Sequence, residues 1–335
     1  DLPVTAAAAA AVVTLTARHK GLCGNDIDAR VNYYDGDATP AGLTVAFVAM
    51  AGGTGNPDAT AGFAIIGDEW YTDWVIPWTD AANLAAVKTE MASRWGPLRM
   101  IEGRAWAAAG GSHAVLSTLG EALNNPWLRL FGLKGSPTEP CVRAAIQCVV
   151  GAASLAIDPA RPLQTLALPG VLAPVQADRF TLAERNLLLY SGIATERVSQ
   201  DGTVSIERAI TTYRETSTGA DDPSYLDTET IATLTFLRYD VRTFVPRKYP
   251  RHKLADDGTR FGPGQKVMTP KLMKAELIAR FSLWEGAGLV EDFDTFKVKL
   301  IVERDGSDRD RLNALIPPDI INGFRVFAGL VQFTL

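Results

Sequence analysis

The feature that most constrains the fold is an alternation of short apolar runs with longer helical patterns between residues 69 and 155. The apolar runs predict strands, and the segments that follow them predict helices. The predicted strands are 74–77, 100–107 and 127–133, and the predicted helices are 80–94, 112–123 and 140–155. Strands that alternate with helices of this length form βαβ units around a mostly parallel sheet with covered faces. We therefore predict an α/β domain, which we extend over residues 1–195.

The pattern loses this regular order toward the C-terminus. Thr181 and Glu184 have the spacing of a capping box and begin a predicted helix at 181–190. The later predicted elements are a hairpin at 197–206 around Asp201-Gly202, helices at 225–245 and 271–284, and strands at 297–304 and 324–335. Pro246 is expected to end the first of these helices. We predict an α+β domain over residues 196–335.

The signals before residue 69 are weaker. The alanine-rich segment 5–18 predicts a helix, while 29–34 and 43–50 predict short strands. The chain begins at Asp1 without a methionine and runs directly into an apolar segment, so we expect an N-terminal part of the protein to be missing. That segment is about half as long as the roughly 20 residues that cross a bilayer, and we expect no direct membrane insertion.

Several kinds of site are disfavoured by composition. Three cysteines, Cys23, Cys141 and Cys148, form no CxxC pair, which argues against a disulfide scaffold or a cysteine-based zinc site. The last two lie seven apart on one helix face and are predicted to be buried core thiols. The glycine-rich stretch 51–55 lacks the features of a phosphate-binding loop and is predicted to be a flexible turn. We predict no metal and no cofactor.

The adjacent pair Ser112-His113 is the one suggestion of catalysis. Neighbouring residues on a helix point about 100° apart, so these two cannot form a nucleophile–base hydrogen bond with each other. No GxSxG elbow is present either. We predict no catalytic residues and no enzyme, and keep an α/β hydrolase as the alternative.

A basic segment runs from Arg238 to Arg280. It holds eleven Lys or Arg and four acidic residues, a net charge of +7, which leaves −12 for the rest of a chain whose total is −5. The segment is either a solvated face or a surface for an acidic partner, and on its own it also fits a monomeric module that binds an anionic ligand. Nucleic acid is disfavoured, because in the basic loop 247–270 only Tyr249 and Phe261 are interleaved as stacking platforms.

The last residues, 324–335, have a strand-like sequence that is largely apolar on both faces. Such a strand either lies in the centre of this chain's own sheet or is donated to a neighbouring copy through backbone hydrogen bonds. Pro317-Pro318 and Asn322-Gly323 are candidate joints that aim the segment outward.

These segments resemble one family. The resemblance rests on YPRHKLADDGTRFGPGQ at 249–265, VMTPK at 267–271, Trp284-Glu285, GLVEDF at 288–293, DRLNALIPP at 310–318 and IINGFRVF at 320–327. Together they resemble the tail sheath proteins of Mu-like contractile phages. The match is dense from about residue 225 to 335, whereas residues 1–180 fit by pattern more than by motif.

The resemblance implies a structural role. It implies an α/β domain of subtilisin-like but non-catalytic fold, followed by a C-terminal α+β sheath domain that faces the tube and ends in a strand-exchange arm at about 320–335. Family members polymerise as hexameric rings around a tail tube, between a baseplate and a tail terminator. Contraction of this sleeve drives the tube through the host envelope. The implied location is the virion, after assembly in the bacterial host cytoplasm; a phage-derived bacteriocin or injection machine is the close alternative.

Two sets of residues follow as expected contacts. Part of the basic segment is expected to face an acidic tube surface: Arg242, Arg247, Lys248, Arg251, Lys253, Arg260, Lys266, Lys271 and Lys274. The expected inter-subunit arm comprises Phe324, Val326, Phe327, Leu330, Val331, Phe333 and Leu335.

Overall fold

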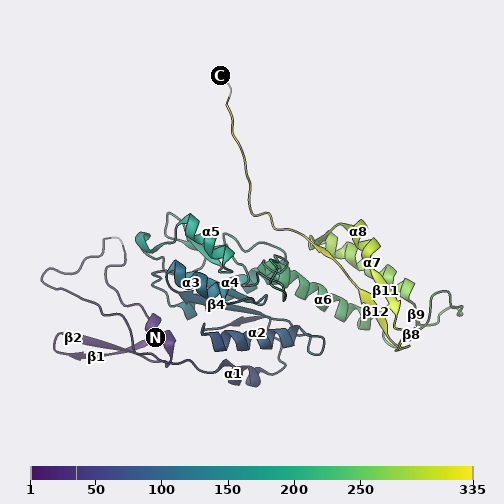
Figure 1. The fold of residues 1–335 in the computed structure, drawn as a ribbon, viewed down its shortest axis with the longest axis horizontal. Helices are drawn as coiled ribbons and strands as arrows, with labels where there is room; N and C mark the ends of the chain where they lie inside the picture. The colour runs from purple at the N-terminus through teal and green to yellow at the C-terminus, as the bar shows by residue number, and fades with distance from the viewer. Residues whose placement is uncertain (1, 35, 334–335) are drawn as a thin grey trace. The chain divides into compact units, whose positions relative to one another are not determined.

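The computed structural model describes residues 2–34 and 36–333, and they form two compact units. The first unit comprises Asp1–Ala156 and Leu163–Ile231, and the second Ile157–Pro162 and Ala232–Leu335. Each unit is described by itself (Figure 1). The first unit continues past residue 195, where we expected a boundary, because Ala194 bonds to the parallel sheet and the strand that follows forms a hairpin within the same unit.

A three-stranded parallel sheet forms the centre of the first unit, in the order β3-β4-β5. The strands are β3 (Asp73–Val75), β4 (Arg104–Gly110) and β5 (Leu128–Leu133). The helices that follow them are α2 (Ala81–Trp95), α3 (His113–Glu121) and α4 (Pro140–Ile157). Asp80 and Ser112 cap α2 and α3 by accepting backbone N–H bonds. The predicted βαβ order and parallel pairing are thus confirmed.

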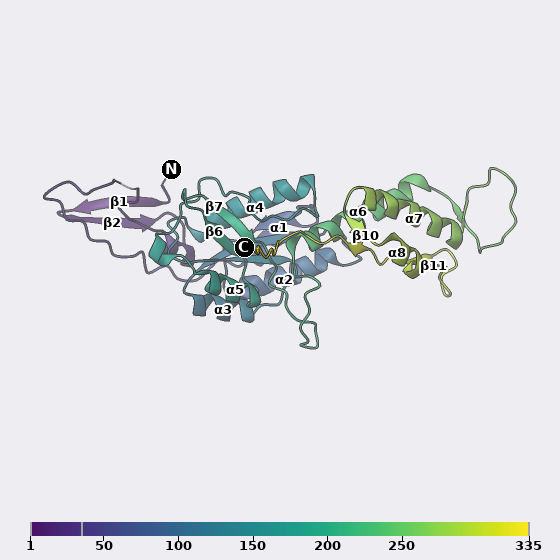
Figure 2. The ribbon, with the colours of Figure 1, turned by 90° about the horizontal axis from the view of Figure 1, so that it is seen from above.

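The two faces of this sheet are covered by different helices (Figure 2). One face packs Ala105, Leu128 and Leu130 against apolar side chains of α2, α3 and α5 (Leu182–Tyr190). The other face packs Trp106 against α4, where a Cβ built on Gly151 would lie 2.3 Å from the indole ring. Because strand side chains alternate between faces, both faces of β4 and β5 are buried. Glycine is required at 151 for helix and sheet to approach this closely.

Helix α4 also has the length and composition of a membrane-crossing segment, and it alone does so in the part of the chain that the structure describes. Only 33% of that window is buried. Its buried residues include Arg143, Gln147 and Gly151, which face the interior of the first unit. A helix that covers a sheet passes the same test, so the finding is weak evidence for a membrane.

The N-terminal segment differs from the prediction. Residues 5–18 do not form a helix but an antiparallel hairpin of β1 (Val4–Ala9) and β2 (Val12–Ala17). The β-branched residues of 12–16 favour the pleated conformation, and Ala10 supplies the positive φ (52°) of the turn. The predicted strands at 29–34 and 43–50 are also wrong, since neither stretch pairs with another strand among the described residues. The short helix η1 (Leu22–Asp26) precedes the first stretch, and α1 (Ala59–Ile66) follows the second.

The last elements of the first unit confirm the turn and cap predictions. Helix α5 begins with the predicted capping box of Thr181 and Glu184. It is preceded by the short helix η2 (Gln176–Asp178). The predicted hairpin is present as β6 (Thr195–Val198) paired antiparallel with β7 (Val204–Arg208).

The second unit packs helices against short strands. Its helices are α6 (Thr228–Lys248, which begins in the first unit), α7 (Pro270–Gly286) and α8 (Phe293–Lys299). Its strands are β8 (Lys253–Leu254), β9 (Val267–Met268), β10 (Val290–Glu291), β11 (Ile301–Arg304), β12 (Leu312–Leu315) and β13 (Asp319–Ile320). The core centres on Phe281, whose ring stacks on Phe296 with centroids 4.0 Å apart.

Three predicted boundaries in this unit need correction. Pro246 lies inside α6 rather than ending it. The missing N–H of Pro246 removes one hydrogen bond from the last turn of the helix. Packing of Val245 and Tyr249 against the core supports this turn. Residues 297–299 belong to α8, so the strand begins only at Ile301. The stretch 324–333 forms no strand and leaves the second unit as an extended, exposed segment (Figure 1).

Candidate functional site

The predicted basic set divides into neutralised and unneutralised cations. Lys248 pairs with Glu276 at 2.5 Å, and Arg242 lies over the ring of Tyr239. Arg280, at the end of the segment, makes a bidentate pair with Asp240, which also accepts a 2.8 Å hydrogen bond from the indole of Trp284. These contacts hold α6 against α7. Lys248 therefore has a structural partner within its own unit.

The other basic side chains remain available to a partner. Within residues 2–34 and 36–333, no acidic partner within 4 Å is found for Arg247, Arg251, Lys253, Arg260, Lys266, Lys271 or Lys274. All but Lys274 are exposed. The middle members lie on the exposed loop between β8 and β9, whose ends are joined by the pairing of Lys253 with Val267. Because these cations repel one another without neutralisation, a partner surface that supplies carboxylates would be favoured.

The large apolar side chains of the described arm are exposed. Phe324, Val326, Phe327, Leu330, Val331 and Phe333 are each at least 75% exposed. Leu335 lies outside the described residues. The interpretation of this stretch as a central strand of the chain's own sheet is wrong for the described part, because residues 324–333 pair with no strand of their own chain.

The base of this segment is fixed. Strand β13 pairs antiparallel with β10, the amide N–H of Ile321 donates to the carbonyl of Leu289, and Asn322 donates to Glu291. The chain is therefore anchored by strand pairing and side-chain contacts up to residue 322, and the described residues beyond it join no strand. The predicted joint at Asn322-Gly323 coincides with this change.

The pair Ser112-His113 lies at the N-terminus of helix α3. Ser112 Oγ accepts the amide N–H of Val115 as the cap of α3, and His113 is the first residue of that helix. No Ser–His hydrogen bond is found in the described residues, and no described group of three or more His, Cys, Asp or Glu could hold a metal ion. Burial raises the pKa of the Cys148 thiol to about 12 and that of Cys141 to about 11. Cys148 is buried as predicted, whereas Cys141 is only partly buried.

Sequence reasoning missed the buried charges of the first unit. Arg129 is fully buried in β5, donates to Thr228 Oγ1 at 3.1 Å and to the Trp127 carbonyl at 2.9 Å, and desolvation lowers its pKa to about 9. Arg104 pairs with Asp73, which also accepts from the Trp106 indole at 2.9 Å. Arg104 and Arg129 each interrupt an apolar strand run, and this position could have indicated a buried charge that needs a partner.

Comparison with known proteins finds two family domains in the chain. A family model described as the phage tail sheath protein central domain matches residues 52–212, and one described as the phage tail sheath C-terminal domain matches residues 220–334. The chain is 44% identical, over all of its 335 residues and 69% of the relative, to the Mu-like prophage FluMu tail sheath protein of Haemophilus influenzae. The chain belongs to the phage tail sheath family.

Two solved sheath proteins share the fold. The sheath tail protein of Listeria innocua aligns with a TM-score of 0.56 at 12% identity, over 82% of this chain and 59% of that one. The one of Desulfitobacterium hafniense aligns with a TM-score of 0.53 at 15% identity, over 85% of this chain and 66% of that one. This sheath protein thus spans about two thirds or less of those chains, and its likeness to them concerns the fold.

Membership in this family makes the chain a structural tail sheath protein of the phage type. The model for the C-terminal domain covers both the basic loop and the described arm. The two sets of contact residues that we predicted therefore lie in the domain that the family shares. Their contacts with tube and neighbour remain predictions.

Proposed function

We propose that this chain is a non-enzymatic sheath subunit that polymerises with copies of itself as hexameric rings, stacked into a helical sleeve around a tail tube. Contraction of the sleeve drives the tube through the host envelope, with baseplate and tail terminator proteins at its ends. Family membership supports this proposal. We place the protein in the virion of a phage, assembled in the host cytoplasm, or in a phage-derived injection particle.

The observation that carries the proposal is the apolar stretch 324–333, which forms no strand with its own chain. Its six large apolar side chains are exposed within their own chain. Burying a side chain of this kind contributes about 1.5–3 kcal/mol, so a neighbour that covered all six would gain on the order of 10 kcal/mol before the cost of ordering the segment. A segment of this composition is unfavourable in water, and donation to a neighbour removes it from water.

Hairpin β11–β12 is the proposed acceptor. It forms an isolated antiparallel pair, with Ile301 opposite Leu315, and no third strand of the described residues joins it. Ile301 is 50% and Leu315 59% exposed. A two-stranded sheet is marginally stable in water, and its free edges can accept a further strand through backbone hydrogen bonds. The donated segment supplies that strand and covers the exposed apolar side chains.

The exposed loop between β8 and β9, together with the basic residues that precede it, is the proposed contact with the tube. Exposed ion pairs contribute at most about 1 kcal/mol each, so several of them hold a partner reversibly and release it together. This suits a sleeve that must grip the tube before contraction and slide along it afterwards. The cations that lack internal partners, including Arg247, Arg251 and Arg260, are those expected to make these contacts.

Negative-stain electron microscopy of the intact chain, beside a version that ends after Asn322, tests the proposal. Both are incubated with purified tail tube protein as a template. We expect long hollow sleeves from the intact chain and monomers from the shortened one, whose melting temperature should be unchanged. Sleeves from both versions would show that the donated strand is not essential for linking the subunits. Monomers from both, with and without the tube, would contradict the sheath role of this chain.

A further inference from the structure

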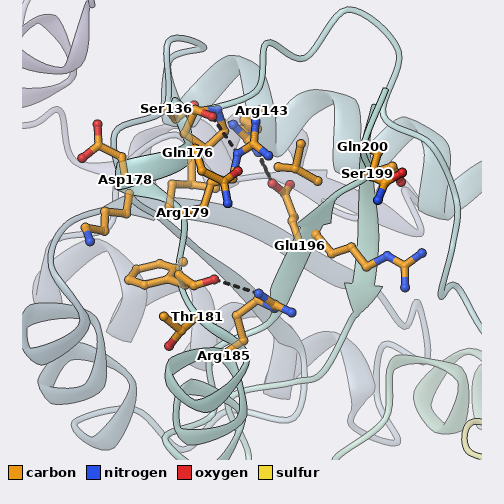
Figure 3. A pocket seen from close by; sticks show the side chains of 17 residues that line it. Ser136, Arg143, Gln176, Asp178, Arg179, Thr181, Arg185, Glu196, Ser199 and Gln200 are labelled. Carbon is orange, nitrogen blue, oxygen red and sulfur yellow. Dashed lines mark hydrogen bonds and ion pairs between the residues drawn. The ribbon is translucent and has the colours of Figure 1, made fainter. Parts of the chain in front are cut away.

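A polar cavity of about 600 Å³ opens at the carboxyl end of β5 in the first unit (Figure 3). Its walls come from the end of β5, from α4, from residues 174–181, and from α5 and β6. Ala194, just before β6, bridges in parallel to Phe131 of β5, so β6 extends past the end of the sheet. The carboxyl ends of parallel strands are where α/β proteins bind ligands.

The charge of the lining is strongly positive. The lining contains five basic residues and two acidic ones: Lys134, Arg143, Arg179, Arg185 and Arg197, with Asp178 and Glu196. Two of the cations are neutralised: Arg143 pairs with Glu196, and Arg185 pairs with Glu207 at 2.7 Å. Neutralisation by these pairs therefore leaves an excess of positive charge in the cavity.

The remaining three cations are free to bind. Lys134 lies over the ring of Phe180 at 5.8 Å, and Arg179 donates only its Nε to the Pro174 carbonyl, at 2.9 Å. No ion pair of Arg179 or Arg197 is found in the described part of the chain. Figure 3 shows Arg179 and Arg185 on the cavity wall, where Arg185 donates to the Phe180 carbonyl at 2.7 Å.

The wall behind them is rigid. The side chain of Arg143 is only 3% exposed, and its guanidinium is held by Glu196 and by Ser136 Oγ at 2.6 Å. Gln147 donates to the same Glu196 carboxylate. This buried network fixes one side of the cavity, so a ligand does not need to order it. A preorganised polar wall with unneutralised guanidinium groups is suited to bind an oxyanion.

We propose that this cavity binds carboxylate groups, which Lys134, Arg179 and Arg197 neutralise. Guanidinium forks match carboxylates bidentately. The first unit itself carries 24 acidic residues against 15 basic ones, so a second copy of the chain brings carboxylates at high local concentration. The source is either an acidic side chain of a neighbouring copy or a free polycarboxylate, and the chemistry is the same for both.

Calorimetric titration of the full chain with citrate tests the site directly and does not depend on the proposed sheath function. We expect saturable binding that weakens by about tenfold or more in Arg179→Ala/Arg197→Ala and disappears in Arg179→Glu/Arg197→Glu. Lys88→Glu, an exposed charge reversal on α2 outside the lining, should bind citrate normally. Unchanged melting curves are required of all variants.

Assembly of the same variants on the tube separates the two sources. This arm relies on the proposed function. Citrate binding with normal assembly of the Arg179→Glu/Arg197→Glu variant supports a free polycarboxylate. A carboxylate from a neighbouring copy is supported if the Arg179→Glu/Arg197→Glu variant assembles poorly, added citrate does not restore its assembly, and Lys88→Glu assembles normally. If the wild-type chain binds no citrate and the double variant assembles normally, the proposal is wrong.

Discussion

The two units use their charges in different ways. The first unit contains 24 acidic and 15 basic residues, and its buried cations are neutralised or hydrogen-bonded inside the fold, as Arg94, Arg104 and Arg143 are. The second contains 14 acidic and 18 basic residues, and several of its cations have no acidic partner within the described residues. The first unit uses its buried charges to complete its own fold, whereas the second unit leaves several cations and apolar side chains exposed.

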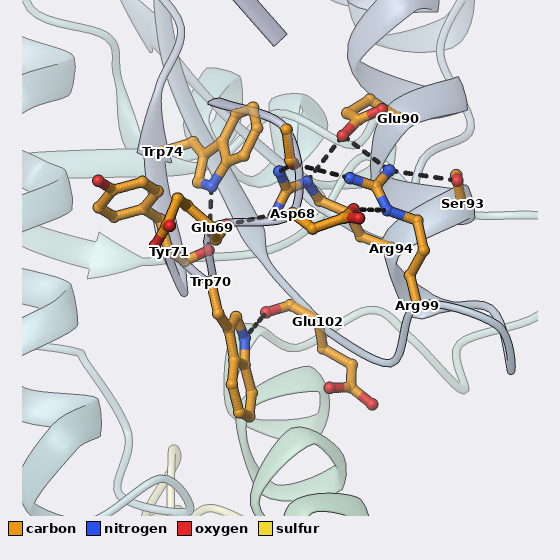
Figure 4. A network of polar contacts seen from close by, with 11 residues as sticks. Asp68, Glu69, Trp70, Tyr71, Trp74, Glu90, Ser93, Arg94, Arg99 and Glu102 are labelled. Atoms are coloured by element: carbon orange, nitrogen blue, oxygen red, sulfur yellow. Dashed lines mark hydrogen bonds and ion pairs between the residues drawn. The ribbon is translucent and has the colours of Figure 1, made fainter. Parts of the chain in front are cut away.

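The largest stability effect is expected at Arg94, in the network that joins α2 to residues 67–71 (Figure 4). Its side chain is fully buried, donates to Glu90, to the carbonyl of Glu69 and to that of Gly67, and lies 4.5 Å from the centre of the Trp74 ring. Arg94→Ala empties a fully buried site and removes the donor of the Glu69 carbonyl, whereas Glu90 and the Gly67 carbonyl still accept from Arg99. The variant should cost about 3–4 kcal/mol of unfolding free energy. Urea denaturation measures it.

The matched control lies in the same network. Arg99 also pairs with Glu90 but is partly exposed, so Arg99→Ala should cost about 1 kcal/mol or less. Equal losses for both variants would show that burial does not decide the worth of these ion pairs.

The next effect concerns the packing of α4 on the sheet. Gly151→Val places atoms into the Trp106 ring and should destabilise the chain by about 2–3 kcal/mol. Gly62→Ala in α1, where nothing lies within 4 Å of the added Cβ, should be neutral or stabilising by up to about 1 kcal/mol. Thermal melts of both variants measure the difference. A harmless Gly151→Val would contradict the close approach of helix and sheet.

A smaller effect is expected at the N-terminus of α5. Thr181 Oγ1 accepts the amide N–H of Glu184. The Glu184 carboxylate accepts the amide N–H and the hydroxyl of Thr181, and these two hydrogen bonds lower its pKa. Thr181→Ala should cost about 1 kcal/mol. Thr181→Ser keeps the acceptor and should restore most of the stability in the same denaturation experiment. If both variants melt alike, the cap has no measurable weight.

The smallest stability effect, with the largest loss of binding, is expected in the second unit. Replacing Arg247, Arg251, Lys253 and Arg260 with Glu removes no internal ion pair and should change the unfolding free energy by no more than about 0.5 kcal/mol. Co-sedimentation should nevertheless show loss of tube attachment. Lys297→Glu/Lys299→Glu, exposed on α8 of the same unit, is the control. Normal attachment of the fourfold variant would contradict the tube-facing assignment.

Local sequence patterns predicted most of the secondary structure of the first unit. The alternation from β3 to α4 and the caps at Asp80, Ser112 and Thr181 depend on neighbouring residues, and the structure confirms them. The hairpin at the N-terminus was missed because alanine has the highest helix propensity, whereas the β-branched residues of the second half and pairing between the two halves favour strands. The cavity and its buried network were not predictable, because Arg143 and Glu196 are brought together from elements 53 residues apart.

The same contrast explains which site residues could be named in advance. The exposed apolar run and the basic segment are contiguous in the sequence, and composition alone reveals them. Composition did not reveal that Lys248 and Arg280 have internal partners, since Glu276 and Asp240 lie on facing helices. Tertiary contacts therefore separate the cations that hold the unit together from those available to a partner.

Cross-linking of assembled sleeves tests the donated strand most directly. A variant with Val326→Cys in the arm and Leu315→Cys in β12 is assembled on the tube and treated with a short bismaleimide. The two single variants are controls for Cys23, Cys141 and Cys148. We predict a ladder of covalent oligomers from the double variant alone. A monomer band from sleeves that assembled normally would contradict strand donation between copies.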